Sequence, residues 1–191
     1  MRKIIVSEYV TLDGVMEDPG GADKTEHGGW SFQFWSDESA KYKFDELLSS
    51  DALLLGRVTY QGFAKAWPSM KDAGVFGERM NNIPKFVVSR TLKEVEWNNS
   101  TLINGDLPEE VSSLKQQPGQ DLLVSGSGEL VHTLMQHALI DEYRLMVHPV
   151  VLGSGKRLFK DGTYIKALTL VSSTPLGKGI VVLTCQPDRK E

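Results

Sequence analysis

A turn of small residues after the apolar run 122–124 is the stretch of the chain best suited to binding an anion. The turn and the start of the predicted helix after it comprise Gly126, Ser127, Gly128, Glu129 and Leu130. The first N–H groups of a helix have no partner within it, and the helix dipole adds about half a positive charge at that end. Glycines also let a pyrophosphate approach the main chain closely. Because Gly126-x-Gly128 lacks the third glycine of the dinucleotide fingerprint, a purely structural turn is the alternative.

Three other predicted strands are followed by residues of a similar kind. The strands are residues 3–6, 52–55 and 84–88. The residues that follow them are Asp13 and Gly14, Gly56 and Arg57, and Ser89 and Arg90. Arginine can hold a phosphate with two parallel hydrogen bonds, and ligands of open α/β sheets bind beyond the carboxyl ends of the strands. The agreement of the four motifs predicts a nucleotide site at one edge of a sheet.

The order of the predicted elements indicates which sheet this is. Strands and helices alternate over roughly the first 140 residues, and the remainder is mostly strand. The predicted helices are residues 37–48, 57–67, a short one within 72–82, 107–117 and one from 129 onward. A weak strand is predicted at 101–103, and the later strands are 143–147, 150–152, 167–173 and 179–184. This order favours a single α/β domain over residues 1–191, with a mainly parallel sheet, antiparallel C-terminal strands and helices on both faces.

Composition and charge limit the classes of partner, site and location that are expected for this protein. The 191 residues carry a net charge of −4, which argues against a general nucleic-acid or membrane-surface binder, because either would need a basic face. The single Cys185 excludes an internal disulfide and any CxxC site. The four histidines form neither an i, i+4 pair nor an HExxH motif, so no metal site is expected. With no predicted signal segment or membrane span, we expect a cytoplasmic protein.

A glycine-rich, charged loop over residues 17–29 precedes four aromatic residues. Loops of this length are often lids or binding loops. The aromatic residues are Trp30, Phe32, Phe34 and Trp35. They could form the wall of a site for a planar ligand, or they could anchor the loop to the core, and the pattern favours neither reading.

The motifs together resemble the dihydrofolate reductase-like superfamily, and most closely the C-terminal reductase domain of the bifunctional riboflavin-biosynthesis deaminase/reductase. The resemblance covers nearly the whole chain and is carried by residues 11–14, 54–60, 87–90, 124–130, 139–145 and 148–155. It implies a dihydrofolate reductase-like three-layer fold, bound NADPH and a homodimer. The residues that would contact the cofactor are Leu12, Gly14, Gly56, Arg57, Thr59, Ser89, Arg90, Gly126, Ser127, Gly128, Glu129 and Leu130. Trp30, Phe34 and Tyr60 would face the substrate.

The resemblance implies an NADPH-dependent reductase acting on a small heterocycle, with 5-amino-6-(5-phosphoribosylamino)uracil as the candidate substrate. Asp13 is the candidate proton donor, and its alternative role is that of a turn residue bonded to its own backbone. Ser127 stands where the family often has glycine, and no zinc deaminase signature is present. Dihydrofolate reductase activity is an alternative, although no acid of the first helix can be matched to the folate enzymes. A non-catalytic NADP-binding module and a structural dimer are further alternatives.

Overall fold

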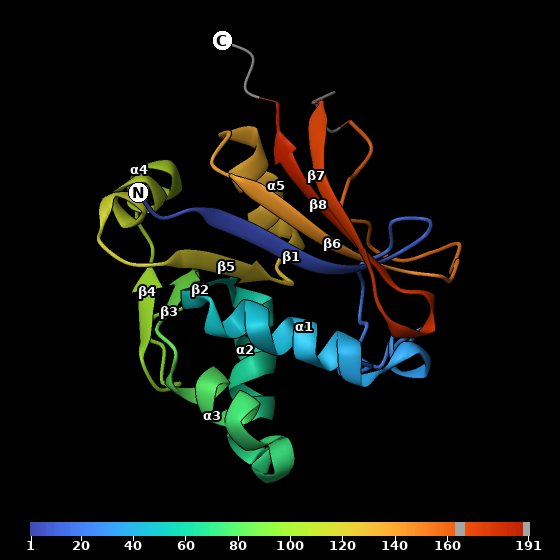
Figure 1. The fold of residues 1–191 in the computed structure, drawn as a ribbon. Coiled ribbons are helices and arrows are strands. Elements are labelled where there is room, and N and C mark those ends of the chain that lie inside the picture. Colours follow the sequence, from blue (N-terminus) through green and yellow to red (C-terminus); the bar gives the residue numbers. More distant parts are fainter. Residues whose placement is uncertain (163–166, 189–191) are drawn as a thin grey trace.

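The computed structural model describes residues 1–162 and 167–188, and these form one twisted sheet of eight strands (Figure 1). The strands are β1 (Ile4–Thr11), β2 (Ser50–Gly56), β3 (Lys85–Val88), β4 (Ser100–Ile103), β5 (Asp121–Ser125), β6 (Glu142–His148), β7 (Leu168–Pro175) and β8 (Val181–Pro187). Their order is β4-β3-β2-β5-β1-β6-β8-β7. All pairs from β4 to β6 are parallel, whereas β8 and β7 are antiparallel to their neighbours. The predicted mainly parallel sheet with an antiparallel C-terminal edge is confirmed.

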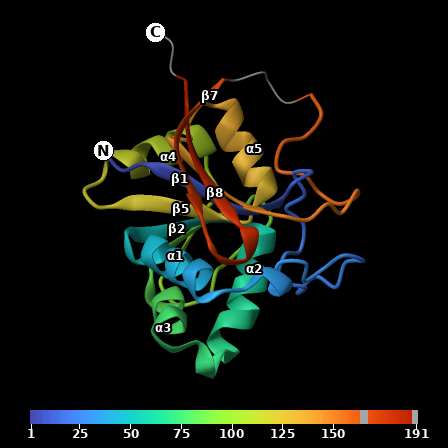
Figure 2. The same cartoon turned by 45° about the vertical axis from the view of Figure 1, so that its right-hand side comes forward.

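Helices cover both faces of this sheet (Figures 1 and 2). They are α1 (Asp37–Leu48), α2 (Arg57–Ala66), α3 (Gly74–Asn82), α4 (Leu107–Gln116) and α5 (Gly128–Gln136), with short 3-10 turns η1 (Phe32–Phe34), η2 (Trp67–Ser69), η3 (Lys71–Ala73) and η4 (Gly177–Gly179). Capping defines where α1 and α4 begin: Ser36 and Ser39 bond reciprocally to each other's backbone N–H, and Asp106 accepts the N–H of Glu109. Within the described ranges, no helix is both long enough and apolar enough to cross a membrane.

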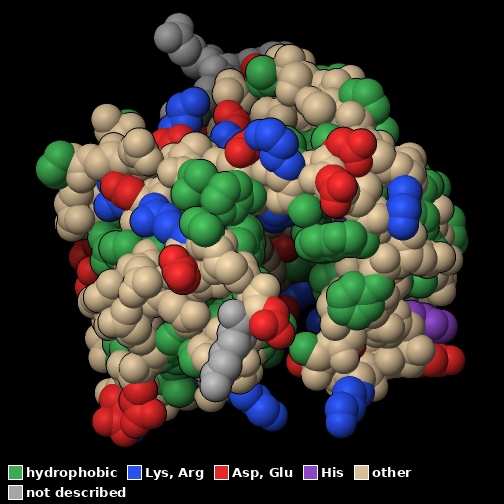
Figure 3. All heavy atoms as spheres, turned by 60° about the horizontal axis from the view of Figure 1, so that its bottom comes forward, with side chains coloured by type: hydrophobic (Ala, Val, Ile, Leu, Met, Phe, Trp, Pro, Cys, Tyr) green, Lys and Arg blue, Asp and Glu red, His purple; other side chains and the backbone are tan. Residues whose placement is uncertain are grey.

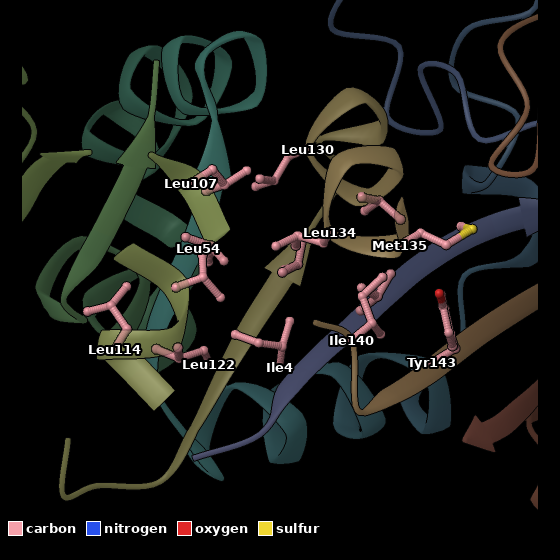
Figure 4. Close-up of a cluster of buried hydrophobic side chains, with 14 of the residues drawn as sticks. Ile4, Leu54, Leu107, Leu114, Leu122, Leu130, Leu134, Met135, Ile140 and Tyr143 are labelled. Atoms are coloured by element: carbon pink, nitrogen blue, oxygen red, sulfur yellow. The ribbon is translucent and has the colours of Figure 1, made fainter. Parts of the chain in front are cut away.

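The core consists of two main layers, one on each face of the sheet. Ile4 of β1 packs in the layer beneath α4 and α5, while the next residue, Ile5, packs in the layer beneath α1 to α3. Leu130, Leu134 and Met135 come from α5 into the first layer (Figure 4). Strands buried on both faces read as continuous apolar runs, which is why β1, β2 and β5 were visible in the sequence.

One predicted strand is wrong. Residues 150–152 do not extend the sheet, because β6 ends at His148 and Pro149 follows it. The backbone N–H groups of Leu152 and Gly153 donate to the Asp13 carboxylate instead of to a neighbouring strand. The loop after β6 is thereby bonded to the turn after β1.

Candidate functional site

The carboxyl ends of four neighbouring parallel strands form a row along one edge of the sheet, and β1 extends beyond the other three. The register pairs Gly56 of β2 with Val88 of β3 and Ser7 of β1 with Ser125 of β5, and β1 then continues alongside β6 to Thr11. The order β3-β2-β5-β1 therefore brings the residues that follow these strands to one edge of the sheet. Adjacent strands lie about 4.8 Å apart, so the row spans roughly 14 Å. The four motifs predicted to converge at a sheet edge all leave strands of this row.

Two consecutive left-handed residues form the turn between β5 and α5. Gly126 has φ 63°, and Ser127 has φ 66° and ψ 41°. A left-handed conformation costs a serine about 1–2 kcal/mol, and here the Ser127 Oγ accepts a hydrogen bond from the Gly56 N–H at 2.9 Å. This bond ties the turn after β5 to the start of α2. The side chain of the N-cap residue Ser127 does not cap α5, so it leaves the first N–H groups of this helix available to a ligand.

The backbone of this turn lies against α2. A Cβ atom on Gly126 would lie 3.0 Å from both Cγ2 and Oγ1 of Thr59, and a Cβ atom on Gly56 would lie 3.5 Å from the Ser127 Cβ. A Cβ atom on Gly128 would lie 3.1 Å from the Met16 Sδ. Gly56, Thr59, Gly126 and Ser127 thus form one continuous surface, and Leu130 is buried beneath it.

Glu8 lies directly beneath the glycine turn and was missed in the sequence. Its side chain is on β1, only 4% of the residue is exposed, and its Oε2 accepts the Gly126 N–H at 3.0 Å. Among the described residues, its Oε1 is buried without a hydrogen-bond partner. Burial raises the pKa of the Glu8 carboxyl well above its ordinary value, and the positive charge of Lys43 opposes that rise. The alternation of Val6, Glu8 and Val10 was the available signal for an inward-facing acid.

The residues after β2 and β3 differ in accessibility. Arg57 is exposed, and its Nη1 donates to the Gln61 Oε1 at 3.1 Å. Ser89 is buried, and its Oγ accepts the N–H groups of Thr91 and Leu92, so it shapes the loop. Arg90 is exposed, and within the described part of the chain its side chain forms no hydrogen bond or ion pair. Arg90 is therefore the more accessible of the predicted phosphate contacts.

Glu129 lies in the first turn of α5, where its charge could repel an anionic ligand. Its carboxylate is exposed and pairs with the Lys160 ammonium group. The hydrogen bond from Lys160 lowers the pKa of Glu129. The ion pair reduces the negative charge that Glu129 presents to the α5 N-terminus.

The structure gives Asp13 the role of a turn residue. Its carboxylate accepts hydrogen bonds from the Thr11 Oγ1 at 2.6 Å and from the Gly153 N–H at 2.8 Å. These bonds, led by that from Thr11, lower the pKa of Asp13 to about 2. A carboxylate that is ionised near neutral pH has no proton to give, so the role of proton donor does not suit Asp13. Its neighbour Leu12 is 63% exposed, and Gly14 has φ 79° in open space.

Some of the predicted aromatic residues anchor the loop to the core, and others are exposed to solvent. Trp30 is buried, donates from Nε1 to the Glu17 carbonyl at 2.8 Å, and packs edge-on against His148, as Phe34 does. Tyr60 is buried too, and its hydroxyl accepts the Trp97 N–H at 3.0 Å. The predicted substrate-facing residues Trp30 and Tyr60 are therefore core residues. The exposed rings of the segment are Phe32 and Trp35.

Glu46, an acid of the first helix, is buried in an ionic cluster on the face of β1 opposite to that of Glu8. Glu46 accepts the Ser7 hydroxyl at 2.7 Å, pairs with Lys43, and lies 3.5 Å from the Arg144 guanidinium. Sequence spacing could not single out this residue among the four acids of α1.

Figure 3 shows a narrow cleft in the face seen from the α3 side, with acidic and basic side chains at its depth and hydrophobic side chains on its rims.

Comparison with known proteins gives concordant results. The family model of the RibD C-terminal domain matches residues 2–182. YyaP of Bacillus subtilis (strain 168), an uncharacterized protein, is 33% identical over 184 residues, which cover 94% of this chain and 92% of YyaP. The fold is similar to that of a Shewanella sp. PV-4 protein assigned to riboflavin biosynthesis, with a TM-score of 0.76, 23% identity and coverage of 98% and 99% of the two chains. It is also similar to Enterococcus faecalis dihydrofolate reductase complexed with NADP(H), with a TM-score of 0.61, 12% identity and coverage of 97% and 96%.

Proposed function

The chain belongs to the RibD C-terminal domain family, and on this basis we propose that it is a reductase that uses NADPH to reduce a small heterocyclic substrate. The observation that carries the proposal is the glycine turn. A Cβ atom on Gly126 would lie only 3.0 Å from Thr59, and the side chain of the N-cap residue Ser127 does not cap the α5 helix that follows. The backbone N–H groups at the start of α5 can receive a pyrophosphate, while the Gly126 N–H remains bonded to Glu8.

The residues of the row fit the remaining parts of a dinucleotide. Arg90, at the β3 end, can hold the adenosine 2′-phosphate that distinguishes NADPH from NADH. Gly126, Ser127 and Gly128 would hold the pyrophosphate two strands away, and Leu12 would border the nicotinamide beyond β1. When bound, NADPH supplies a hydride, so the protein needs no nucleophile and contributes binding and orientation.

The reduction adds a hydride and a proton to the substrate, and the candidate substrate within the family is 5-amino-6-(5-phosphoribosylamino)uracil. Phe32 and Trp35 are the exposed rings available to a planar ligand, in place of the buried Trp30 and Tyr60. Dihydrofolate reductase activity and an NADP-binding module without turnover are the alternatives. A panel of pyrimidine and pterin substrates, assayed by NADPH oxidation, separates the three.

Replacement of Arg90 by alanine tests the cofactor assignment. We expect R90A to weaken NADPH binding by tenfold or more, about 1.4 kcal/mol, and to change NADH binding by less than twofold. Calorimetric titration of both cofactors at low and moderate salt measures this. The exposed Lys93 supplies the matched control, since K93A removes a nearby positive charge without touching the predicted contact. Equal losses for both cofactors would contradict the role of Arg90, and absence of binding by the wild-type protein would contradict the reductase proposal.

We also propose that the protein is a homodimer that associates through β7. This strand is outermost in the sheet, and all eight of its residues are exposed. They include Leu168, Leu170 and Val171. An unpaired edge with apolar side chains is a template for pairing with another chain, and a second copy of the same strand can pair with it about a two-fold axis.

A further inference from the structure

Glu8 occupies a position where a carboxylate is costly. It lies at the centre of the sheet on β1, between Val6 and Val10 on one strand face, and it is almost fully buried. A buried charge requires a partner or becomes neutral. No lysine or arginine among the described residues forms an ion pair with Glu8; the charged groups that act on it are Lys43 and Glu46 of α1, which have opposite signs.

The two carboxyl oxygens of Glu8 have different surroundings. Oε2 accepts the Gly126 N–H at 3.0 Å, which fixes the carboxyl group beneath the first residue of the glycine turn. Oε1 is buried and has no partner within the described residues. A protonated carboxyl is a donor as well as an acceptor, so a proton on Oε1 makes the group neutral while Oε2 continues to accept the Gly126 N–H.

We propose that Glu8 is a positioning residue whose neutral form holds the glycine turn for a bound diphosphate, so that diphosphate binding takes up a proton at Glu8. The inference rests on the proposed cofactor site. A neutral carboxyl supports Gly126 without adding charge, whereas a carboxylate would place a negative charge directly beneath the anion.

The linkage has a definite sign. A bound anion raises the pKa of a nearby carboxyl further, since like charges disfavour ionisation. By reciprocity, protonation of Glu8 strengthens anion binding to the same extent. Affinity is therefore highest below the pKa of Glu8 in the free protein and falls as the pH rises through it. One linked proton changes affinity by at most tenfold per pH unit.

The glutamine variant provides the test. Glu8→Gln keeps the size of the side chain and an oxygen for the Gly126 N–H, and it cannot ionise. NADPH dissociation constants are measured by calorimetry from pH 6 to 9 for both proteins. The ratio of the two dissociation constants at each pH cancels the contribution from titration of the 2′-phosphate itself, whose pKa is about 6. We expect affinity to fall with pH by three- to tenfold per unit more in the wild type than in E8Q, over at least one pH unit. E109Q, at an exposed site on α4, should follow the wild type.

A second measurement needs no variant. The wild type is titrated calorimetrically with NADH, which lacks the 2′-phosphate, in two buffers of different ionisation enthalpy. The difference between the two binding enthalpies gives the number of protons taken up. We expect a maximum between 0.5 and 1 proton per site. NADPH and NADH binding without proton uptake, together with parallel pH profiles for wild type and E8Q, would overturn the role of Glu8 and leave the reductase proposal intact.

A third probe separates the two proposals. If neither dinucleotide binds, ADP is titrated in the same two buffers, over a pH range in which its free titration is subtracted. Binding of ADP with proton uptake that E8Q abolishes would support Glu8 and refute the reductase assignment. Absence of ADP binding would overturn both.

Discussion

At the scale of single residues, His148 is held in a cage of aromatic rings. The rings of Tyr9, Trp30 and Phe34 lie 5.2, 5.1 and 5.7 Å from it, and its Nδ1 lies 2.9 Å from the Met146 carbonyl. Only 2% of His148 is exposed. Burial lowers the pKa of His148, because removal from water disfavours the imidazolium cation. Trp30, His148 and Phe34 thereby connect the segment after the long loop to the end of β6.

This cage predicts acid sensitivity. Below the unfolded-state pKa of about 6.5, the unfolded chain binds a proton at His148 that the folded chain excludes. Stability is therefore lost as the pH falls from about 6.5 through the lower pKa of the folded state. We expect the melting temperature to fall between pH 7.5 and 5.5, and to fall less in His148→Phe. H137Q, at an exposed histidine, serves as the control and should keep the wild-type slope. Identical slopes in all three proteins would contradict the assignment.

Residue types indicated which residues lie at the strand ends better than they indicated residue roles. Gly56, Gly126 and Arg90 lie at or just after strand ends as the sequence predicted, and their contact with a cofactor stays a prediction. The role of Asp13 depended on Leu152 and Gly153, which are far away in sequence and supply the N–H groups that hold its carboxylate. The local spacing of residues in the sequence does not reveal contacts between segments that are distant along the chain.

At the scale of elements, the unit β5–turn–α5 depends on the absence of a Cβ at Gly126. We expect Gly126→Ala to destabilise the protein by about 1–2 kcal/mol, the cost of a left-handed alanine, because its φ is 63° and Thr59 lies 3.0 Å from the new atom. NADPH binding should weaken by at least tenfold. Urea unfolding and calorimetry measure the two effects.

Gly62 offers a matched control for that substitution. It lies within α2, and a Cβ there would meet nothing within 4 Å. Since alanine is preferred to glycine inside a helix by up to about 1 kcal/mol, G62A should stabilise the protein and leave cofactor binding unchanged. A similar loss of binding in G62A and G126A would indicate a general effect of the α2 region rather than the turn.

The predicted strand at residues 150–152 is wrong because their segment forms hydrogen bonds to a side chain instead of pairing with a strand. Residues 150–152 are apolar and two of them are β-branched valines, which favours a strand, yet their segment bonds to the turn after β1 through Asp13. By contrast, β1 was predicted as residues 3–6 and continues to Thr11. Its polar residues Ser7 and Glu8 have partners in Glu46 and Gly126, respectively, and the local pattern does not reveal these.

At the scale of the whole molecule, the alternation of strands and helices followed by strands was sufficient to predict the layered fold, because parallel strands need a long crossover connection, which is usually a helix. It could not predict the assembly state. For this we expect light scattering to give twice the 21.2 kDa mass of one chain. Leu170→Lys combined with Val171→Lys should shift the protein to monomer, since the charges would be buried against the second copy.

An apolar residue of similar exposure outside β7 controls for this change. Val75 of α3 is 63% exposed, compared with 56% and 54% for Leu170 and Val171. V75K should leave the mass unchanged. A wild-type protein that is monomeric at micromolar concentration would contradict the proposed dimer.

The central place of β1 has a consequence for how the chain folds during synthesis. β1 pairs only with β5 and β6, which begin at Asp121 and Glu142. At about 5–20 residues per second, a ribosome needs roughly 6–22 s to reach β5 after making β1. Throughout that time the apolar run Ile4, Ile5 and Val6 has both edges unpaired, which is a hazard for aggregation. Nascent chains stalled before residue 121 should therefore depend on chaperones, because the oldest strand of the sheet gains its partners only after β2, β3 and β4 have been made.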